Sequence, residues 1–237
     1  MVIVQHFFGS VKQYIEAVPF AGRSFVLPER CPHPDCQATE SLIRWGTYER
    51  WACTAEGDYR IRIQRVRCKV CGRTHSLLPD FLHPHRHYTI HLLQLAVSLY
   101  LITGLGWERL LKQLSGLARS TLREWVASFA YGAGELLLTF LLRQLLALDP
   151  LAEVPDAAPP QHLNRISDPT TRRRLARAHR FWLVAEQLYA LVKVRLPSLH
   201  FAAAELLPFV LHWLQSQALP PRLFWSPALP HTPTTPF

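Results

Sequence analysis

The segments Cys31–Cys36 (CPHPDC) and Cys68–Gly72 (CKVCG) decide how the first part of this 237-residue chain folds. They carry four thiols as two close pairs, separated by a long stretch of chain. Zinc in structural sites prefers four soft ligands in a tetrahedron, and two short cysteine turns supply two corners each. The spacing therefore predicts one structural Zn²⁺ ion per chain. Its expected ligands are Cys31, Cys36, Cys68 and Cys71.

Other interpretations of these cysteines stay open. The four thiols can instead form two disulfides or fill a core, although Gly72 after the second pair is typical of a metal-binding turn. His33 or His75 can replace one thiol, since Cys3His sites are ordinary zinc chemistry. Four thiolates would close the coordination sphere, so we expect no catalytic zinc. Cys53 has no paired neighbour and is expected to be a free thiol.

The residues between the two cysteine pairs predict a β-hairpin. Residues 42–51 form an aromatic, β-rich run, and residues 59–64 alternate with the period of two of a half-buried strand. Residues 54–58 (TAEGD) predict the turn. The apolar phase shifts after Ile63, which a one-residue bulge near Arg65 would accommodate. Cysteines and strands together predict a zinc ribbon.

The composition predicts a packed protein with a polyanionic partner. Hydrophobic residues make up 49% of the chain and charged residues 18%, which argues against general disorder. The formal net charge of +9 favours nucleic acid first and an anionic membrane surface second. The longest apolar runs, residues 90–102 and 136–148, fall short of a membrane span. Without a secretory signal at the start, we expect a cytoplasmic, nucleoid-associated protein with reduced thiols and no membrane partner.

The helical region that follows predicts a helix-turn-helix. Thr89 can cap a helix running to Ile102, and residues 107–114 and 122–129 then carry matched apolar stripes around a turn at residues 115–118. In such a pair the second helix enters the major groove of DNA by its N-terminal end. The expected contacts with double-stranded DNA are Arg119, Ser120, Thr121 and Arg123. An ordinary helical hairpin with a solvated arginine face is the alternative.

The C-terminal part predicts further helices. A helix at residues 135–148 precedes a proline-rich linker, and a basic run opens the next helix. Three cations at a helix N-terminus oppose the helix dipole, so a DNA phosphate would relieve them; a solvated helix end is the alternative. The basic run is Arg172, Arg173 and Arg174. A last helix from Pro197 is expected to kink or divide at Pro208.

Residues 1–27 and the histidines at positions 83, 85 and 87 give weaker functional signals. Residues 1–27 contain a short strand or helix at residues 11–18, to which we assign no function. His83, His85 and His87 alternate around a proline, which is compatible with a second metal site. They lack a fourth partner, so a basic, solvated hinge is favoured.

Three quoted runs carry a family resemblance. The run CKVCGRTHSLLP (residues 68–79), preceded by GTYER (46–50) and followed by GLARSTLREW (116–125), resembles a domain-of-unknown-function family of bacterial proteins. The zinc ribbon of that family is related to that of insertion-sequence transposases. The resemblance covers residues 28–130 and implies DNA binding, at transposon ends. Such transposases carry a nuclease domain with three carboxylates, which the six aspartates of this chain do not match, so the cutting domain is expected to be absent.

The sequence therefore predicts an α+β protein, with a small N-terminal β zinc ribbon followed by a mostly α-helical region containing a helix-turn-helix. The predicted function is non-enzymatic DNA binding, as a mobile-element accessory protein or transcriptional regulator. Further expected partners are a second copy of the chain or a separate transposase subunit. The alternative is a protein-interaction module that uses the ribbon and the leucine-rich helices. The expected boundaries are 1–27, 28–85 (ribbon), 86–148 (helix-turn-helix domain), 149–164 (linker), 165–219 (helical) and 220–237 (disordered tail).

Overall fold

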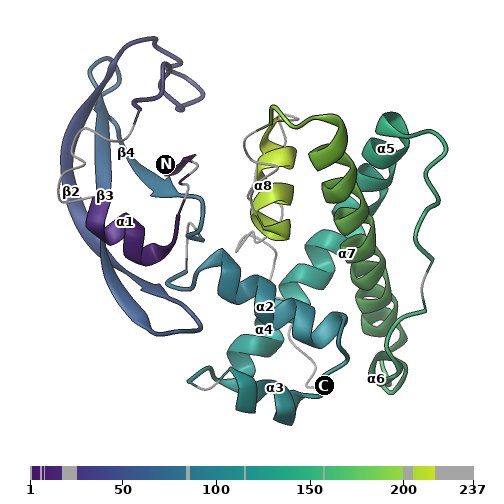
Figure 1. Ribbon diagram of the computed structural model, residues 1–237. Coiled ribbons are helices and arrows are strands. Elements are labelled where there is room, and N and C mark those ends of the chain that lie inside the picture. Colours follow the sequence, from purple (N-terminus) through teal and green to yellow (C-terminus); the bar gives the residue numbers. More distant parts are fainter. Residues whose placement is uncertain are drawn as a thin grey trace. The chain divides into compact units, whose positions relative to one another are not determined.

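The computed structural model describes residues 2–5, 7, 9–17, 26–83, 86–114, 116–156, 158–199 and 205–216. The chain forms two compact units, residues 1–92 and 93–237. Among these residues the strands lie in the first unit, and helices build the second (Figure 1). The predicted mixture of α and β structure is therefore confirmed. The expected tail at residues 220–237 lies outside the described residues.

The elements follow one another in an order that separates strands from helices. In chain order they are β1 (Val2–Gln5), α1 (Val11–Ala17), β2 (Leu42–Cys53), β3 (Asp58–Cys68), β4 (Thr74–Pro79), α2 (Ile90–Leu101), α3 (Trp107–Gln113), α4 (Arg119–Phe129), η1 (Ala130–Leu137), α5 (Leu138–Leu148), α6 (Gln161–Asn164), α7 (Pro169–Arg195) and α8 (Leu206–Ser216).

The first unit is built on a four-stranded sheet in the order β1-β4-β3-β2. β2 and β3 form the predicted antiparallel hairpin, β4 pairs antiparallel with β3, and β1 pairs parallel with β4. Sequence analysis missed β1 and β4. β1 is only four residues long, and β4 begins directly after the second cysteine turn, where the metal pattern dominates the sequence. The sheet is therefore larger than the predicted hairpin.

The bulge of the hairpin lies on β2, whereas the sequence placed it near Arg65 on β3. The register shifts between Arg44 and Thr47, so Trp45 and Gly46 both oppose Arg65. Gly46 has a φ of 84°, in the left-handed region that favours glycine. The strand that contains the glycine takes the extra residue, and the apolar phase shift on β3 reflects this bulge on its neighbour.

Helix α1 contributes Tyr14 to the core of the first unit, although no function was assigned to this segment from the sequence. Tyr14 is fully buried, and its ring lies edge-on to Phe7 and Phe81 with centroid distances of 5.1 and 5.4 Å. Its hydroxyl donates to the carbonyl of Arg62 on β3 at 3.0 Å. This contact ties α1 to the middle of the hairpin (Figure 1).

The second unit packs α4 and its continuation against α7. The predicted apolar stripe of α4 is confirmed, because all four of its residues are buried: Leu122, Trp125, Val126 and Phe129. Phe129 contacts two aromatic residues of α7, Phe181 and Trp182, with ring centroids 5.9 and 5.8 Å away. The aromatic contact joins the two longest helical segments of this unit.

The helix does not stop near residue 130 and restart at residue 135, as the sequence predicts. η1 continues α4 directly into α5 as a π-helical stretch, AYGAGELL. Its small buried residues let α7 come close, and a Cβ on Gly134 would lie 2.7 Å from the carbonyl oxygen of Arg174. The glycines serve close helix packing here, so they do not mark a boundary.

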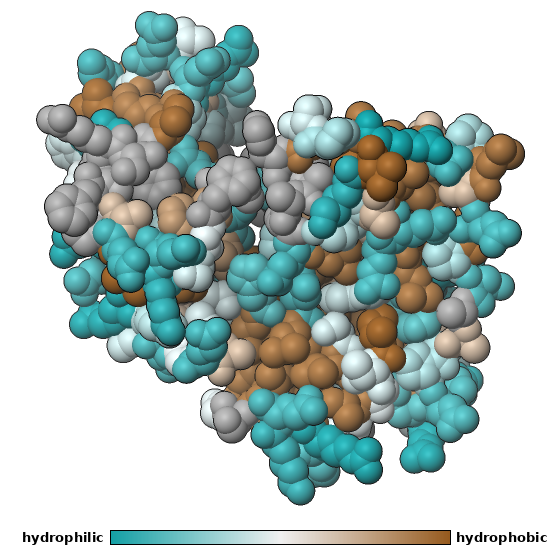
Figure 2. Space-filling model, viewed as in Figure 1, coloured by the Kyte–Doolittle hydropathy of each residue, from teal (hydrophilic) through white to brown (hydrophobic). Residues whose placement is uncertain are grey.

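This continuity also corrects the expectation that no apolar segment is long enough to span a membrane. Arg119–Leu148, 30 residues long, passes that test by length and composition, and 56% of its apolar window is buried inside the structure. Packing against α7 explains that hydropathy, as in the core helix of a soluble protein. Hydrophilic residues cover much of the face shown in Figure 2, with hydrophobic groups between them.

The starts of α2 and α8 bear on two predictions, the Thr89 cap and the kink at Pro208. Thr89 caps α2 as expected, because its hydroxyl accepts the amide of Leu92 at 3.3 Å. Pro208 does not divide a helix, because α8 begins only at Leu206. A proline in the first helical turn lacks an N–H that would have no partner there anyway. The predicted kink is therefore wrong.

We expect Gly134→Ala to lower the free energy of unfolding by about 1–3 kcal/mol, because the added methyl group would meet backbone atoms of α7. Urea denaturation of the full chain measures the change. Gly106→Ala is the matched control, since nothing lies within 4 Å of a Cβ there. An equal effect of both substitutions would contradict the close-packing role of Gly134.

Candidate metal centre

Four cysteine sulfurs from the two predicted turns converge at one end of the sheet. All four lie within 4.8 Å of one another and form a group that can hold a metal ion. The Sγ atoms of Cys31 and Cys71 are 3.8 Å apart, as are those of Cys36 and Cys68. A disulfide needs a sulfur–sulfur distance of about 2.05 Å, so neither pair is bonded.

The first cysteine turn places backbone amides against its sulfurs. The amides of His33 and Ala38 donate to the sulfurs of Cys31 and Cys36, two residues back in each case. Gln37 adopts a φ of 50°, and its amide donates to the carbonyl of His33 at 3.2 Å. A non-glycine residue in this left-handed region is uncommon and indicates that the turn is tightly constrained.

The second turn repeats the arrangement. Amides of Val70 and Cys71 donate to the sulfur of Cys68. Gly72, with a φ of 70°, follows the second cysteine as Gln37 does in the first turn, and its amide donates to the carbonyl of Cys68 at 3.0 Å. The predicted left-handed glycine is confirmed. The two turns therefore present their sulfurs in the same way.

The surroundings of the sulfurs shift the pKa values of Cys31 and Cys68 in opposite directions. Burial raises the pKa of the Cys31 thiol to about 12. In contrast, the hydrogen bond with Ser41, at 3.3 Å, and the amides of the second turn lower the pKa of Cys68 to about 6. A bound cation would stabilise the thiolate form of its ligands.

The predicted histidine alternatives lie beside the sulfur group without joining it. His75 is 1% exposed, and its Nε2 is 3.6 Å from the sulfur of Cys31, as a hydrogen-bond partner. His33 Nδ1 lies 3.7 Å from the Asp35 carboxylate. Cys53 stands at the far end of β2, outside the group, as predicted. Sequence analysis missed Ser41, since a lone serine gives no signal.

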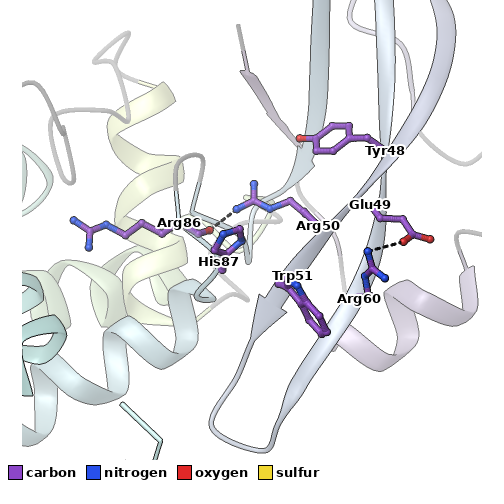
Figure 3. Close-up of a pocket in the computed structure, with 7 residues that line it drawn as sticks. All are labelled: Tyr48, Glu49, Arg50, Trp51, Arg60, Arg86 and His87. Atoms are coloured by element: carbon purple, nitrogen blue, oxygen red, sulfur yellow. Dashed lines mark hydrogen bonds and ion pairs between the residues drawn. The ribbon is translucent and has the colours of Figure 1, made fainter. Parts of the chain in front are cut away.

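The three alternating histidines do not form a second group among the described residues. His83 is buried, His87 is exposed, and His85 lies outside the described residues. Near them is a hollow of about 390 Å³ at the edge of β2, lined by Tyr48, Glu49, Arg50, Trp51, Arg60, Arg86 and His87 (Figure 3). Arg50 donates from Nη2 to the carbonyls of His83 and Arg86, which ties the loop to β2. Arg50 therefore holds this loop against the strand.

The predicted DNA contacts of α4 lie at its start, after the expected turn. Gly116 in that turn has a φ of 95°. Arg119 and Ser120 are exposed and Thr121 is half-buried. Arg119 Nη1 lies 3.3 Å from the Glu108 carboxylate of α3. The two helices and their turn are present, whereas the DNA-binding role of these residues stays a prediction.

Arg123 is less exposed than the helix phase predicts. It is half-buried, and its guanidinium carbon lies 5.7 Å from the ring centroid of Trp107 on α3. Trp107 in turn stacks on Tyr100, with a centroid distance of 4.3 Å. The exposure of Arg123 was predicted from the apolar stripe of α4 alone. That stripe contains no information about the aromatic ring that α3 supplies.

The basic run of α7 begins on a helix that already has an anion at its N-terminus. The Asp168 side chain accepts the amide of Thr171 at 2.8 Å, and this hydrogen bond lowers the pKa of that carboxyl. Arg172 and Arg173 are exposed. Asp168 thus supplies negative charge at this helix start, so the dipole does not by itself require a phosphate there, and the contact of the basic run with DNA stays a prediction.

Arg174 is already bound within the second unit. Its Nε lies 3.3 Å from a carboxylate oxygen of Glu135 on η1, and its guanidinium carbon is 5.4 Å from the ring centroid of Tyr131. Of the three arginines in the basic run, only this one faces η1. To bind a DNA phosphate, the guanidinium of Arg174 would first have to break its ion pair with Glu135.

Comparison with known proteins agrees with part of the predicted resemblance. Residues 31–125 match the family model DUF6431, a domain of unknown function. No curated protein and no solved structure matches the chain. The matched region begins at the first cysteine of the metal group and ends inside α4. A relation to transposases stays a prediction.

We expect the full chain to bind one metal ion per molecule and Cys68→Ser to lose it together with the fold of the first unit. Thiolate sites in small domains contribute on the order of 10 kcal/mol to folding. Elemental analysis and circular dichroism measure the two effects. Cys53→Ser is the matched control and should keep both metal and fold. Equal metal content in all three proteins would contradict the assignment of Cys68.

Proposed function

We propose that this protein is a DNA-binding protein stabilised by structural zinc. The role is that of an accessory protein for a mobile element or of a transcriptional regulator. Three features support it: the four-sulfur group, the net charge of +9 and the uncapped, basic start of α4.

Zinc suits the geometry and the softness of the sulfur group. A tetrahedron with zinc–sulfur bonds of about 2.3 Å has sulfur–sulfur edges of about 3.8 Å. Both short sulfur pairs have that separation. Soft thiolates select zinc over magnesium or calcium, which take oxygen ligands. Four thiolates leave no open position, so the zinc would serve the fold.

The observation that carries the DNA proposal is the N-terminal end of α4. Ala118 occupies the N-cap position and no side chain caps the helix. The first amides of a helix have no partner within it, and together with the helix dipole they favour a phosphate group. Exposed Arg119 and Ser120 stand at the same end. Cation, hydroxyl and free amides would together suit a DNA backbone or a base edge.

The existing contacts of the two α4 arginines are compatible with that role. The pair between Arg119 and Glu108 joins side chains that are 47% and 78% exposed, so it contributes about 1 kcal/mol or less and can open for a phosphate. The Trp107 ring beside Arg123 limits the directions that its guanidinium can take. An arginine held in this way loses less freedom when it binds a guanine edge.

We expect the double variant Arg119→Ala/Arg123→Ala to lose sequence preference for duplex DNA while keeping its fold. One bidentate arginine–guanine contact contributes about 1–3 kcal/mol of discrimination. Selection of duplexes from a random pool, followed by affinity measurements on selected and scrambled sites, measures the loss. Arg143→Ala, an exposed arginine on α5, is the matched control. If the double variant kept full affinity and selectivity, α3 and α4 would be a structural helical hairpin that does not read DNA sequence.

We expect Arg172→Ala/Arg173→Ala to weaken binding to all duplex sequences alike and to reduce its salt dependence. Each lost phosphate contact lowers the slope of log K against log salt by about 0.9. Arg174→Ala would in addition release Glu135, so it should also lower the unfolding temperature. An unchanged salt slope in the double variant would exclude this part of α7 from the interface.

A further inference from the structure

One face of the sheet, next to the metal centre, combines an aromatic ring with two arginines. Residues directly opposite each other in antiparallel strands share a face, so the register of β2, β3 and β4 defines two rows across it. The rows are Ile43, Arg67 and Thr74, and then Trp45, Arg65 and Ser76. We call these six residues the ribbon face.

The ribbon face is reachable by solvent and carries only positive charge. Trp45 is 48% exposed, and the other five side chains are half-buried. None of the six is a carboxylate. Among the described residues, Arg60, Arg119, Arg174 and Arg195 each pair with a carboxylate, and none of these four pairs includes Arg65 or Arg67. The charge of Arg65 and Arg67 is therefore not neutralised by these pairs.

The metal turn holds the centre of the ribbon face in place. Arg67 donates from Nε to the carbonyl of Gly72 at 3.2 Å, and its guanidinium carbon lies 4.6 Å from the ring centroid of Trp45. The tryptophan, which stands in the β-bulge, is thus linked through Arg67 to the second cysteine turn. A ring held in this way is a preformed stacking surface, because little freedom remains to be lost on binding.

The other exposed tryptophan of β2 lies in a different setting. Trp51 is 45% exposed and has Arg60 at 5.5 Å from its ring centroid. Arg60 is paired with Glu49 at 3.3 Å, and Figure 3 shows that pair beside the strand. Ring and arginine are thus present at both sites, but only Trp45 lies among arginines without a carboxylate partner. Charge therefore distinguishes the two sites.

We propose that the ribbon face binds single-stranded nucleic acid, with an unpaired base on Trp45 and neighbouring phosphates on Arg65 and Arg67. Base–aromatic stacking tolerates any sequence because every base has a flat π-face, and a base inside a duplex cannot offer that face to a side chain. The hydroxyls of Thr74 and Ser76 can donate to phosphate or base oxygens. This site is separate from α4 and does not depend on the proposed duplex binding.

An acidic peptide is the competing occupant. It would satisfy the two arginines but would not stack on the exposed part of the indole ring, so the observations favour nucleic acid. Binding of a base therefore depends on the Trp45 ring, whereas binding of an acidic peptide does not.

The test compares two matched tryptophan substitutions in the full, metal-loaded chain. Binding of a fluorescent oligothymidine of about ten nucleotides is followed by anisotropy. We expect Trp45→Ala to weaken binding by about tenfold or more, Trp45→Phe by less, and Trp51→Ala by less than about twofold. Unchanged metal content and unfolding temperature show that each variant is folded. Equal effects of Trp45→Ala and Trp51→Ala, or none, would overturn the proposal.

Three further arms separate the possible occupants. With two phosphate contacts the slope of log K against log salt should be about −1.4, and Arg65→Gln should reduce it by about 0.7. Polyglutamate is the probe for the acidic peptide. If polyglutamate displaces the oligonucleotide, and Trp45→Ala weakens the binding of polyglutamate as much as that of the oligonucleotide, the ribbon face is an acidic-peptide site and the proposal fails. If Trp45→Ala weakens a duplex as much as the single strand, stacking of an unpaired base is excluded. Arg119→Ala/Arg123→Ala should leave single-strand binding unchanged, so failure of either proposal is visible separately.

Discussion

The convergence of four sulfurs is the constraint on which the first unit depends. It joins the chain before β2, the end of β3 and the turn into β4, so one metal ion would fix the ends of three segments. Burial disfavours charge at Cys31, whereas Ser41 and two amides favour it at Cys68. A bound cation would stabilise the thiolate form at both residues, so metal binding would be coupled to folding. The same turn positions Arg67 through Gly72. A change in metal occupancy would therefore reach the ribbon face directly.

Local sequence signals predicted the parts of the fold that depend on local chemistry. The cysteine pairs, the alternating strand of β3, the Thr89 cap and the stripe of α4 all follow from spacing, and each appears as expected. Errors arose where a distant partner decides the outcome. β1 forms because β4 offers it an edge, and η1 forms because α7 approaches its glycines. A single sequence contains no local mark of such partners.

The same distinction applies to the arginines. Helix phase predicted that Arg119 and Arg123 share one exposed face, but Trp107 and Glu108 come from the preceding helix and limit that exposure. Likewise, the basic run of α7 looked unbalanced until Asp168 proved to be its cap. Charge counted along the sequence therefore overstates the charge available to a partner. The arginines that keep a carboxylate-free setting are the better guide, and Arg65 and Arg67 were overlooked because they alternate within a strand.

The two proposed sites, one in each unit, would offer different chemistry to nucleic acid. A helix start with unpartnered amides and an arginine suits the regular backbone of a duplex, because its groups are few and directional. A sheet face with an indole ring suits a strand whose bases are unpaired. Each kind of site alone recognises one state of DNA. A chain that carried both would prefer places where duplex and single strand adjoin, and its preference would exceed either separate affinity only if the connection between the units lets both bind at once.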